Sequence, residues 1–169
     1  MRIQLLSDLH LETEAFDPQP HPQADVLILA GDIDSTWRAL DRFAQWPVPA
    51  IFVAGNHEFD GRELNDAWPA LRERCEEFGL TLLERESLVL DAPDGRRIRF
   101  ELFWRGSEET LAELGRDECE MAGFHVPESW TVAQLESWLG RWLDPARHVC
   151  LPVMRRSQGL ILARGNPHR

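Results

Sequence analysis

Two short runs of apolar residues constrain the fold of this chain more than any other feature. They are Val26–Ala30 (VLILA) and residues 51–54 (IFVA), and neither contains a polar residue. A strand that is buried on one face alternates between apolar and polar residues, whereas a strand covered on both faces is apolar throughout. The two runs therefore predict central strands of a parallel sheet that is covered on both faces.

Helical patterns lie between and after these strands. Ser35 or Thr36 precedes a predicted helix that ends at Trp46-Pro47. Residues 64–78 carry apolar side chains at alternating steps of four and three, and Pro69 predicts a kink or a late start in that helix. Strands that alternate with helices are typical of an α/β fold.

The second half of the chain continues with shorter elements. Residues 80–83, 87–90 and 97–103 are predicted strands, and the turn 92–95 (APDG) joins the last two. Residues 108–121 and 131–142 are predicted helices, the second with a capping box formed by Thr131 and Gln134. One more strand is predicted over 148–154. With no repeat or linker in the sequence, we expect a single domain over 1–169.

Composition restricts the location and the partners of the protein. The net charge of −11 makes nucleic acid an unlikely partner, because binding to a phosphate backbone needs clustered lysine and arginine. The three cysteines are far apart and show no metal-binding spacing, which favours a reducing compartment. No segment approaches the roughly 20 apolar residues of a membrane span, and none is typical of a signal peptide. We therefore expect a cytoplasmic protein with no membrane partner; the oligomeric state is not predicted.

Three polar clusters follow the predicted strands at residues 3–6, 26–30 and 51–54. They contain Asp8 and His10 (SDLH), Asp32 (GD), and Asn56 and His57 (GNHE). An aspartate and a histidine two residues apart in extended backbone share a face and can reach one cation. Carboxylate and imidazole ligands together suit manganese, iron or zinc better than calcium. These side chains therefore predict a metal site, and two ions about 3.5–4 Å apart could clamp a phosphate and activate a water molecule.

These clusters resemble the first three motifs of the calcineurin-like metallophosphoesterases. The resemblance is specific over residues 1–60, extends to about residue 104, and is faint beyond. It implies a β-sandwich flanked by helices, with a shortened or altered C-terminal part. It also implies hydrolysis of a phosphate ester substrate with two divalent metal ions, manganese, iron or zinc, as cofactors.

The resemblance implies a role for each of the matching residues. Asp8 and His10 would bind the first metal, Asp32 would bridge both metals, and Asn56 would bind the second. His57 would contact the phosphate as the catalytic group and protonate the leaving oxygen, because its pKa lies near neutrality. The next residue, a glutamate, would orient His57 or a loop backbone rather than bind metal.

The chain departs from the pattern of that family after His57. The family completes its site with later histidine motifs, but the remaining histidines here are His125, His148 and His168, none of them in such a motif. His148 or His168 could substitute if the tail folds back. A truncated descendant, a frame-shifted one, and one that has lost its ligands all remain open.

Other functions compete with the hydrolase hypothesis. A catalytically impaired relic with at most weak metal binding is the main alternative, and a nuclease is disfavoured by the acidic charge. The sequence contains no P-loop and no GxSxG nucleophile elbow. Cys75 lies on the apolar stripe of a predicted helix and is expected in the core.

Overall fold

The computed structural model describes residues 1–103 and 105–152, and the chain divides into two compact units, 1–103 and 104–169. The first unit contains, in chain order, β1 (Ile3–Leu6), β2 (Val26–Ala30), the 3₁₀ helix η1 (Arg38–Phe43), β3 (Ala50–Val53), the 3₁₀ helix η2 (His57–Phe59), α1 (Leu64–Glu77), β4 (Leu80–Leu82), β5 (Ser87–Asp91) and β6 (Arg97–Glu101). The second unit contains α2 (Ser107–Gly115) and α3 (Val132–Leu139).

A parallel sheet of four strands forms the centre of the first unit. Its strand order is β1-β2-β3-β4, and each strand is parallel to its neighbour. The two apolar runs form the inner strands β2 and β3, in which nearly every residue is buried, as predicted. Because the strands are parallel, the loops that follow β1, β2 and β3 all leave from the same edge of the sheet.

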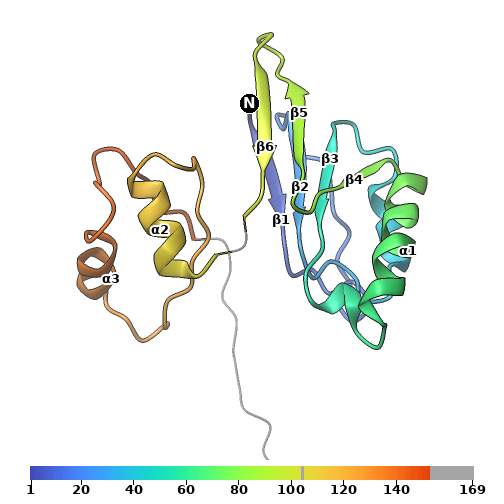
Figure 1. Ribbon diagram of the computed structural model, residues 1–169, viewed down its shortest axis with the longest axis horizontal. Coiled ribbons are helices and arrows are strands. Elements are labelled where there is room, and N and C mark those ends of the chain that lie inside the picture. The colour runs from blue at the N-terminus through green and yellow to red at the C-terminus, as the bar shows by residue number, and fades with distance from the viewer. Residues whose placement is uncertain (104, 153–169) are drawn as a thin grey trace, which may run out of the picture. The chain divides into compact units, whose positions relative to one another are not determined.

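One face of this sheet packs against α1 (Figure 1). Leu27 and Phe52 of the sheet share a buried cluster with Leu71 and Cys75 of α1. Burial of an apolar side chain of this size contributes roughly 1.5–3 kcal/mol, so this layer is a main source of stability. Cys75 is fully buried, as its helical stripe predicted.

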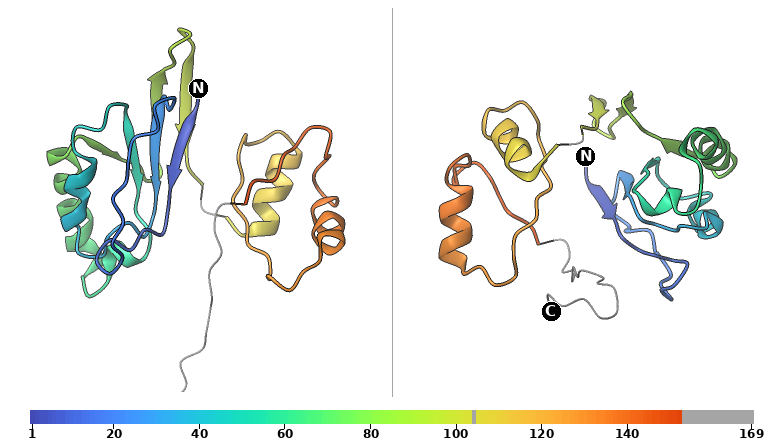
Figure 2. Two further views of the ribbon diagram at one scale, coloured as in Figure 1. Left: turned by 180° about the vertical axis from the view of Figure 1, so that it is seen from behind. Right: turned by 60° about the horizontal axis from the view of Figure 1, so that its bottom comes forward.

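The other face is covered by the antiparallel hairpin of β5 and β6. Side chains alternate between the two faces of a strand, so Val26 points away from the α1 layer that Leu27 faces. Val26 and Ile51 pack with Leu88 and Phe100 of the hairpin. Both views of Figure 2 show the hairpin beside the four-stranded sheet. The inner strands β2 and β3 are therefore covered on both faces, whereas Ile3 and Leu5 of the outer strand β1 are exposed.

The α/β class is confirmed, but the calcineurin-like β-sandwich is not shown. The described residues form one parallel sheet of four strands and one two-stranded hairpin. A sandwich needs two extended sheets whose inner faces interdigitate. Beyond β6, the described part of the chain contains helices and turns but no strand.

The helix predicted between β2 and β3 is shorter than expected. It is the 3₁₀ helix η1, and neither Ser35 nor Thr36 caps it. Instead, the buried carboxylate of Asp34 accepts hydrogen bonds from the main-chain N–H groups of Thr36 (2.8 Å) and Ala39 (2.6 Å). Such local bonds offer the backbone an alternative to an α-helical turn.

The second unit is built around one tryptophan. Trp138 of α3 lies against the rings of Phe124, Trp130 and Trp142, with centroid separations of 5.3–5.7 Å. The capping box at the start of α3 is formed as predicted. No strand forms over residues 148–152, and the rest of the strand predicted there lies outside the described residues. The single domain expected over 1–169 stays a prediction.

Among the helices within residues 1–103 and 105–152, none combines the length and the apolar content needed to cross a membrane.

Candidate metal centre

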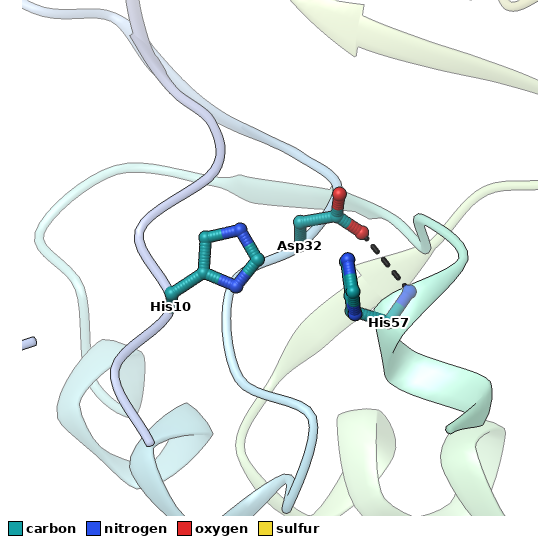
Figure 3. Close-up of side chains that lie close together, drawn as sticks. All are labelled: His10, Asp32 and His57. Carbon is teal, nitrogen blue, oxygen red and sulfur yellow. Dashed lines mark hydrogen bonds between the residues drawn. The ribbon is translucent and has the colours of Figure 1, made fainter. Parts of the chain in front are cut away.

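Three side chains from three strand ends converge at one edge of the parallel sheet. His10 follows β1, Asp32 follows β2, and His57 begins η2 after β3. Each offers a potential ligand atom, and these atoms all lie within 4.8 Å of one another. The two imidazole rings have centroids 5.0 Å apart, and the Asp32 carboxylate lies beside them (Figure 3). All three side chains are partly exposed, so the cluster is open to solvent.

The backbone at this edge adopts a conformation that most residues avoid. Asp8, His10 and Asp32 have φ angles of 51°, 45° and 53°. This left-handed region costs roughly 1–2 kcal/mol per residue for an L-amino acid, and it is used where the surrounding structure enforces it. Here it turns two of the gathered side chains back over the edge of the sheet.

Two glycines allow the loops after β2 and β3 to approach each other. A Cβ atom on Gly55 would lie 2.2 Å from Oδ1 of Asp32, well inside van der Waals contact. Gly31 has φ +82°, and a Cβ atom there would lie 3.1 Å from the Cα atom of Gly55. The close approach lets Asp32 accept a hydrogen bond of 3.1 Å from the main-chain N–H of His57.

A carboxylate lies within hydrogen-bond distance of Nδ1 of each imidazole ring. Nδ1 of His10 lies 3.2 Å from Oε1 of Glu12, and Nδ1 of His57 lies 2.7 Å from Oδ2 of Asp60. An ionised carboxylate can only accept, so in the neutral form of each ring Nδ1 carries the proton and Nε2 keeps its lone pair. Metal-binding histidines are oriented in this way, with a carboxylate on the nitrogen that does not bind the metal.

The charge around His57 favours its protonated form. The hydrogen bond to Asp60 raises the pKa of His57 above its usual value, and this is the largest effect. Partial burial lowers the pKa, whereas the nearby charge of Asp32 raises it further. The carboxylates of Asp60 and Asp32 therefore favour a positive charge on the His57 ring.

Glu58, the residue after His57, is fully buried. Its carboxylate accepts hydrogen bonds from the main-chain N–H groups of Asp32 (3.0 Å), Ile33 (2.7 Å), Asp34 (3.3 Å) and Gly55 (2.6 Å). Glu58 therefore holds the backbone of two loops, which is one of the two roles expected for it from the sequence.

The geometry gathers only part of the predicted metal site. His10 and Asp32 are both present in the cluster of histidine and acidic side chains, and its third member is His57 rather than Asp8. The Asp8 carboxylate accepts a hydrogen bond from the hydroxyl of Ser7. The main-chain oxygen of Asn56 accepts one of 3.1 Å from Phe59. The metal-binding roles of Asp8 and Asn56, and the catalytic role of His57, stay predictions.

His125 and His148 lie in the second unit, and each takes part in a hydrogen bond there. Nδ1 of His148 lies 3.1 Å from the main-chain nitrogen of Asp144. The main-chain N–H of His125 lies 3.4 Å from the hydroxyl of Ser107. His168 lies outside the described residues.

Sequence reasoning overlooked the carboxylates behind the two imidazoles. Glu12 comes two residues after His10, and Asp60 comes three residues after His57. The signal was present, since an acidic residue two or three positions after a histidine in a turn can reach its ring.

A family model for a PBP superfamily domain matches residues 92–169, which is less than half of the chain. No curated protein matches the chain. Among solved structures, the chain is similar to the crystal structure of phosphopantetheinyl hydrolase (PptH) from Mycobacterium tuberculosis, with a TM-score of 0.49 and 18% sequence identity. The match covers 83% of this chain and 60% of that one, so this chain spans less than two thirds of that protein.

The prediction of a calcineurin-like metallophosphoesterase is wrong. The family model that matches describes a PBP superfamily domain, and it covers the half of the chain in which the resemblance was faint. The predicted two-metal hydrolysis of phosphate esters and the alternative of an impaired relic of that family fall with it. The physical reason is that the three motifs are short. They describe polar residues at the carboxyl ends of parallel strands, where many unrelated sheets carry their sites.

Proposed function

We propose that the first unit binds one divalent transition-metal ion through His10, Asp32 and His57. The observation that carries this proposal is the convergence of three potential ligand atoms within 4.8 Å, from three separate loops. Two imidazoles and one carboxylate suit zinc, iron or manganese, whereas calcium and magnesium prefer ligand sets made of oxygen.

The orientation of the two rings supports the same proposal. With Nδ1 of each ring directed at a carboxylate, the free Nε2 atoms are the donors available to an ion. Two imidazole rings at 5.0 Å from each other and beside a carboxylate form a compact donor set at the surface. Three donors are sufficient for one ion, and a second ion would need further ligands such as Asp8 and Asn56.

A metal held by three protein side chains keeps a coordination position for water or a substrate, which distinguishes catalytic from structural sites. The chain's own contribution is to bring the three donors together at a place that is open to solvent. His10 and His57 are 33% and 41% exposed in their side chains, so a small molecule has access to both.

The test is a calorimetric titration of the chelator-treated protein with Mn²⁺ and, separately, with Zn²⁺. We expect one ion per chain. Asp32→Asn keeps the size of the side chain but removes its charge, and we expect it to weaken binding by about 100-fold or more, because loss of a ligand exceeds the 10- to 100-fold cost of losing an orienting partner.

His21→Ala is the matched control for His10→Ala and His57→Ala. His21 is an exposed histidine of the same unit and lies outside the cluster. Both cluster variants should lose binding while the control keeps it. Equal affinity in all three variants, or no binding by the wild-type protein, would refute the proposal.

We also propose a reducing, cytoplasmic setting for the protein. The three cysteines Cys75, Cys119 and Cys150 are free thiols, and burial raises the pKa of Cys75 to about 12. Protein that is purified without reductant and unfolded in the presence of a thiol-reactive reagent should show three reactive thiols per chain. A lower count would contradict this setting.

A further inference from the structure

Glu58 is a charged residue with no exposed surface, and it lies next to His57 in the chain. A carboxylate is rarely buried in this way unless hydrogen bonds replace its hydration. Its bonding partners therefore indicate what the residue does.

The carboxylate of Glu58 joins two loops. Oε2 accepts from the N–H of Asp32 in the loop after β2 and from the N–H of Gly55 in the loop after β3. Oε1 accepts from the N–H of Ile33 at 2.7 Å. An ionised carboxylate is an acceptor only, and successive main-chain N–H groups form a concave site that suits an anion.

The main-chain oxygen of Glu58 is also held. It accepts a hydrogen bond of 2.8 Å from Nε1 of Trp37, and Nη1 of Arg62 lies 3.3 Å away. The guanidinium group of Arg62 in turn stacks over the Trp37 ring at 4.1 Å. Glu58 is thus fixed at both its side chain and its backbone.

Both histidines of the metal cluster are tied to Asp32, one of the residues whose main-chain N–H binds Glu58. Asp32 has its N–H bound to Glu58, and its carbonyl oxygen accepts a hydrogen bond of 3.1 Å from the N–H of His10. Its side-chain Oδ1 accepts from the N–H of His57. The position of the Asp32 backbone therefore sets the positions of both histidines.

We propose that Glu58 is a positioning residue that sets the metal affinity of the cluster. It does so by holding Asp32 in its left-handed conformation and by fixing the loop after β3 to the loop after β2. This inference rests on the proposed function, because it concerns the affinity of that same site. Glu58 itself does not touch the ion.

The neighbouring Asp34 offers a matched control. It is also a buried carboxylate, and its partners are the N–H groups of Thr36 and Ala39, together with the hydroxyl of Thr36. Asp34 stabilises the turn that leads into η1, and none of its partners is a member of the metal cluster. Asp34→Asn therefore removes a comparable buried charge without releasing Asp32.

The experiment compares Glu58→Gln with Asp34→Asn in the full chain. The Gln amide places an NH₂ group where an acceptor is needed. We expect the Kd for Co²⁺ to rise by about 10- to 100-fold in Glu58→Gln, the range found for residues that orient metal ligands, and by less than about threefold in Asp34→Asn. The visible absorption bands of bound Co²⁺ should change only in Glu58→Gln, because they report coordination geometry.

If Glu58→Gln does not fold, Glu58→Asp takes its place in the same comparison. The shorter side chain keeps the charge but cannot reach both loops, so we expect the same direction of change. Wild-type affinity and wild-type bands in the folded Glu58 variant would overturn the inference, as would an equal loss in Asp34→Asn.

A measurement without metal separates this inference from the proposed function. The ring centroids of His10 and His57 are 5.0 Å apart, close enough for a nuclear Overhauser effect between the rings in chelator-treated protein. We expect that signal in the wild type and in Asp34→Asn, but not in the Glu58 variants. If wild-type protein binds no metal while this pattern holds, the metal proposal fails and with it the effect of Glu58 on metal affinity, but Glu58 still positions the two rings. If the signal persists in the Glu58 variants, the positioning role fails.

Discussion

Different interactions stabilise the metal-cluster edge of the first unit and the helical second unit. At the cluster edge, buried carboxylates bind main-chain N–H groups, and glycines let two loops touch. In the second unit, a single buried tryptophan contacts three other aromatic rings. Hydrogen bonds to backbone have strict geometry, whereas aromatic contacts tolerate shifts. A precise arrangement of ligands is therefore expected at the first region and not at the second.

The largest effect on stability should come from Trp138→Ala in the second unit. Trp138 is 8% exposed, and its loss leaves a cavity among Phe124, Trp130 and Trp142. We expect a cost of about 3–5 kcal/mol, read from faster hydrogen exchange in peptides of α2 and α3. Val132→Ala on the same helix is the control, because Val132 is 71% exposed. A matching loss of metal affinity in Trp138→Ala would break the distinction between the two regions.

Gly55→Ala should damage the cluster edge by a smaller amount. The added methyl group would collide with the Asp32 carboxylate, and such overpacking costs about 1–3 kcal/mol. Gly106→Ala is the comparison in the other unit, since no atom lies within 4 Å of a Cβ atom placed there. Urea unfolding and metal titration should both change in Gly55→Ala and stay near wild type in Gly106→Ala. Unchanged metal binding in Gly55→Ala would show that the close contact is not needed.

Asp60→Asn should shift a titration while leaving the fold in place. The hydrogen bond to Asp60 raises the pKa of His57, so protonated His57 favours the folded state below its unfolded pKa. That contribution disappears as the pH rises through the raised pKa of the folded state. In Asp60→Asn, the pKa of His57 should fall back towards 6.5, measured by NMR titration of the metal-free protein. Asp66→Asn on the exposed face of α1 should leave the titration unchanged.

The smallest effect should come from Arg72→Gln. Arg72 pairs with Glu86 at 3.4 Å, and both side chains are about half exposed. Exposed ion pairs contribute roughly 0–1 kcal/mol, so we expect little change in the urea midpoint. A loss comparable to that of Gly55→Ala would mean that surface charge, rather than buried hydrogen bonding, holds the first unit.

Sequence patterns predicted most elements of the first unit because their signals are local. The apolar runs of β2 and β3, the stripe on α1 that contains Cys75, and the turn between β5 and β6 each follow from a few neighbouring residues. The capping box at Thr131 was equally local.

The remaining features depend on contacts between distant residues. Glu58 was expected to orient a ring or a loop, but that its carboxylate binds N–H groups of the loop after β2 could not be read from its neighbours. Which side chains meet in the cluster depends on left-handed backbone at Asp8, His10 and Asp32. That conformation cannot be read from these residue types. The family prediction failed because three short motifs specify a sheet edge rather than a whole chain.

His10 follows β1, and β1 is an outer strand that pairs only with β2 among the described strands. Local opening of an outer strand costs less free energy than opening of an inner strand. When β1 opens, His10 moves away from Asp32 and His57, which stay with the core. A bound ion would link the loop after β1 to the loops after β2 and β3 and so oppose the opening of β1. Loss of the ion and release of the first strand would then be a single event.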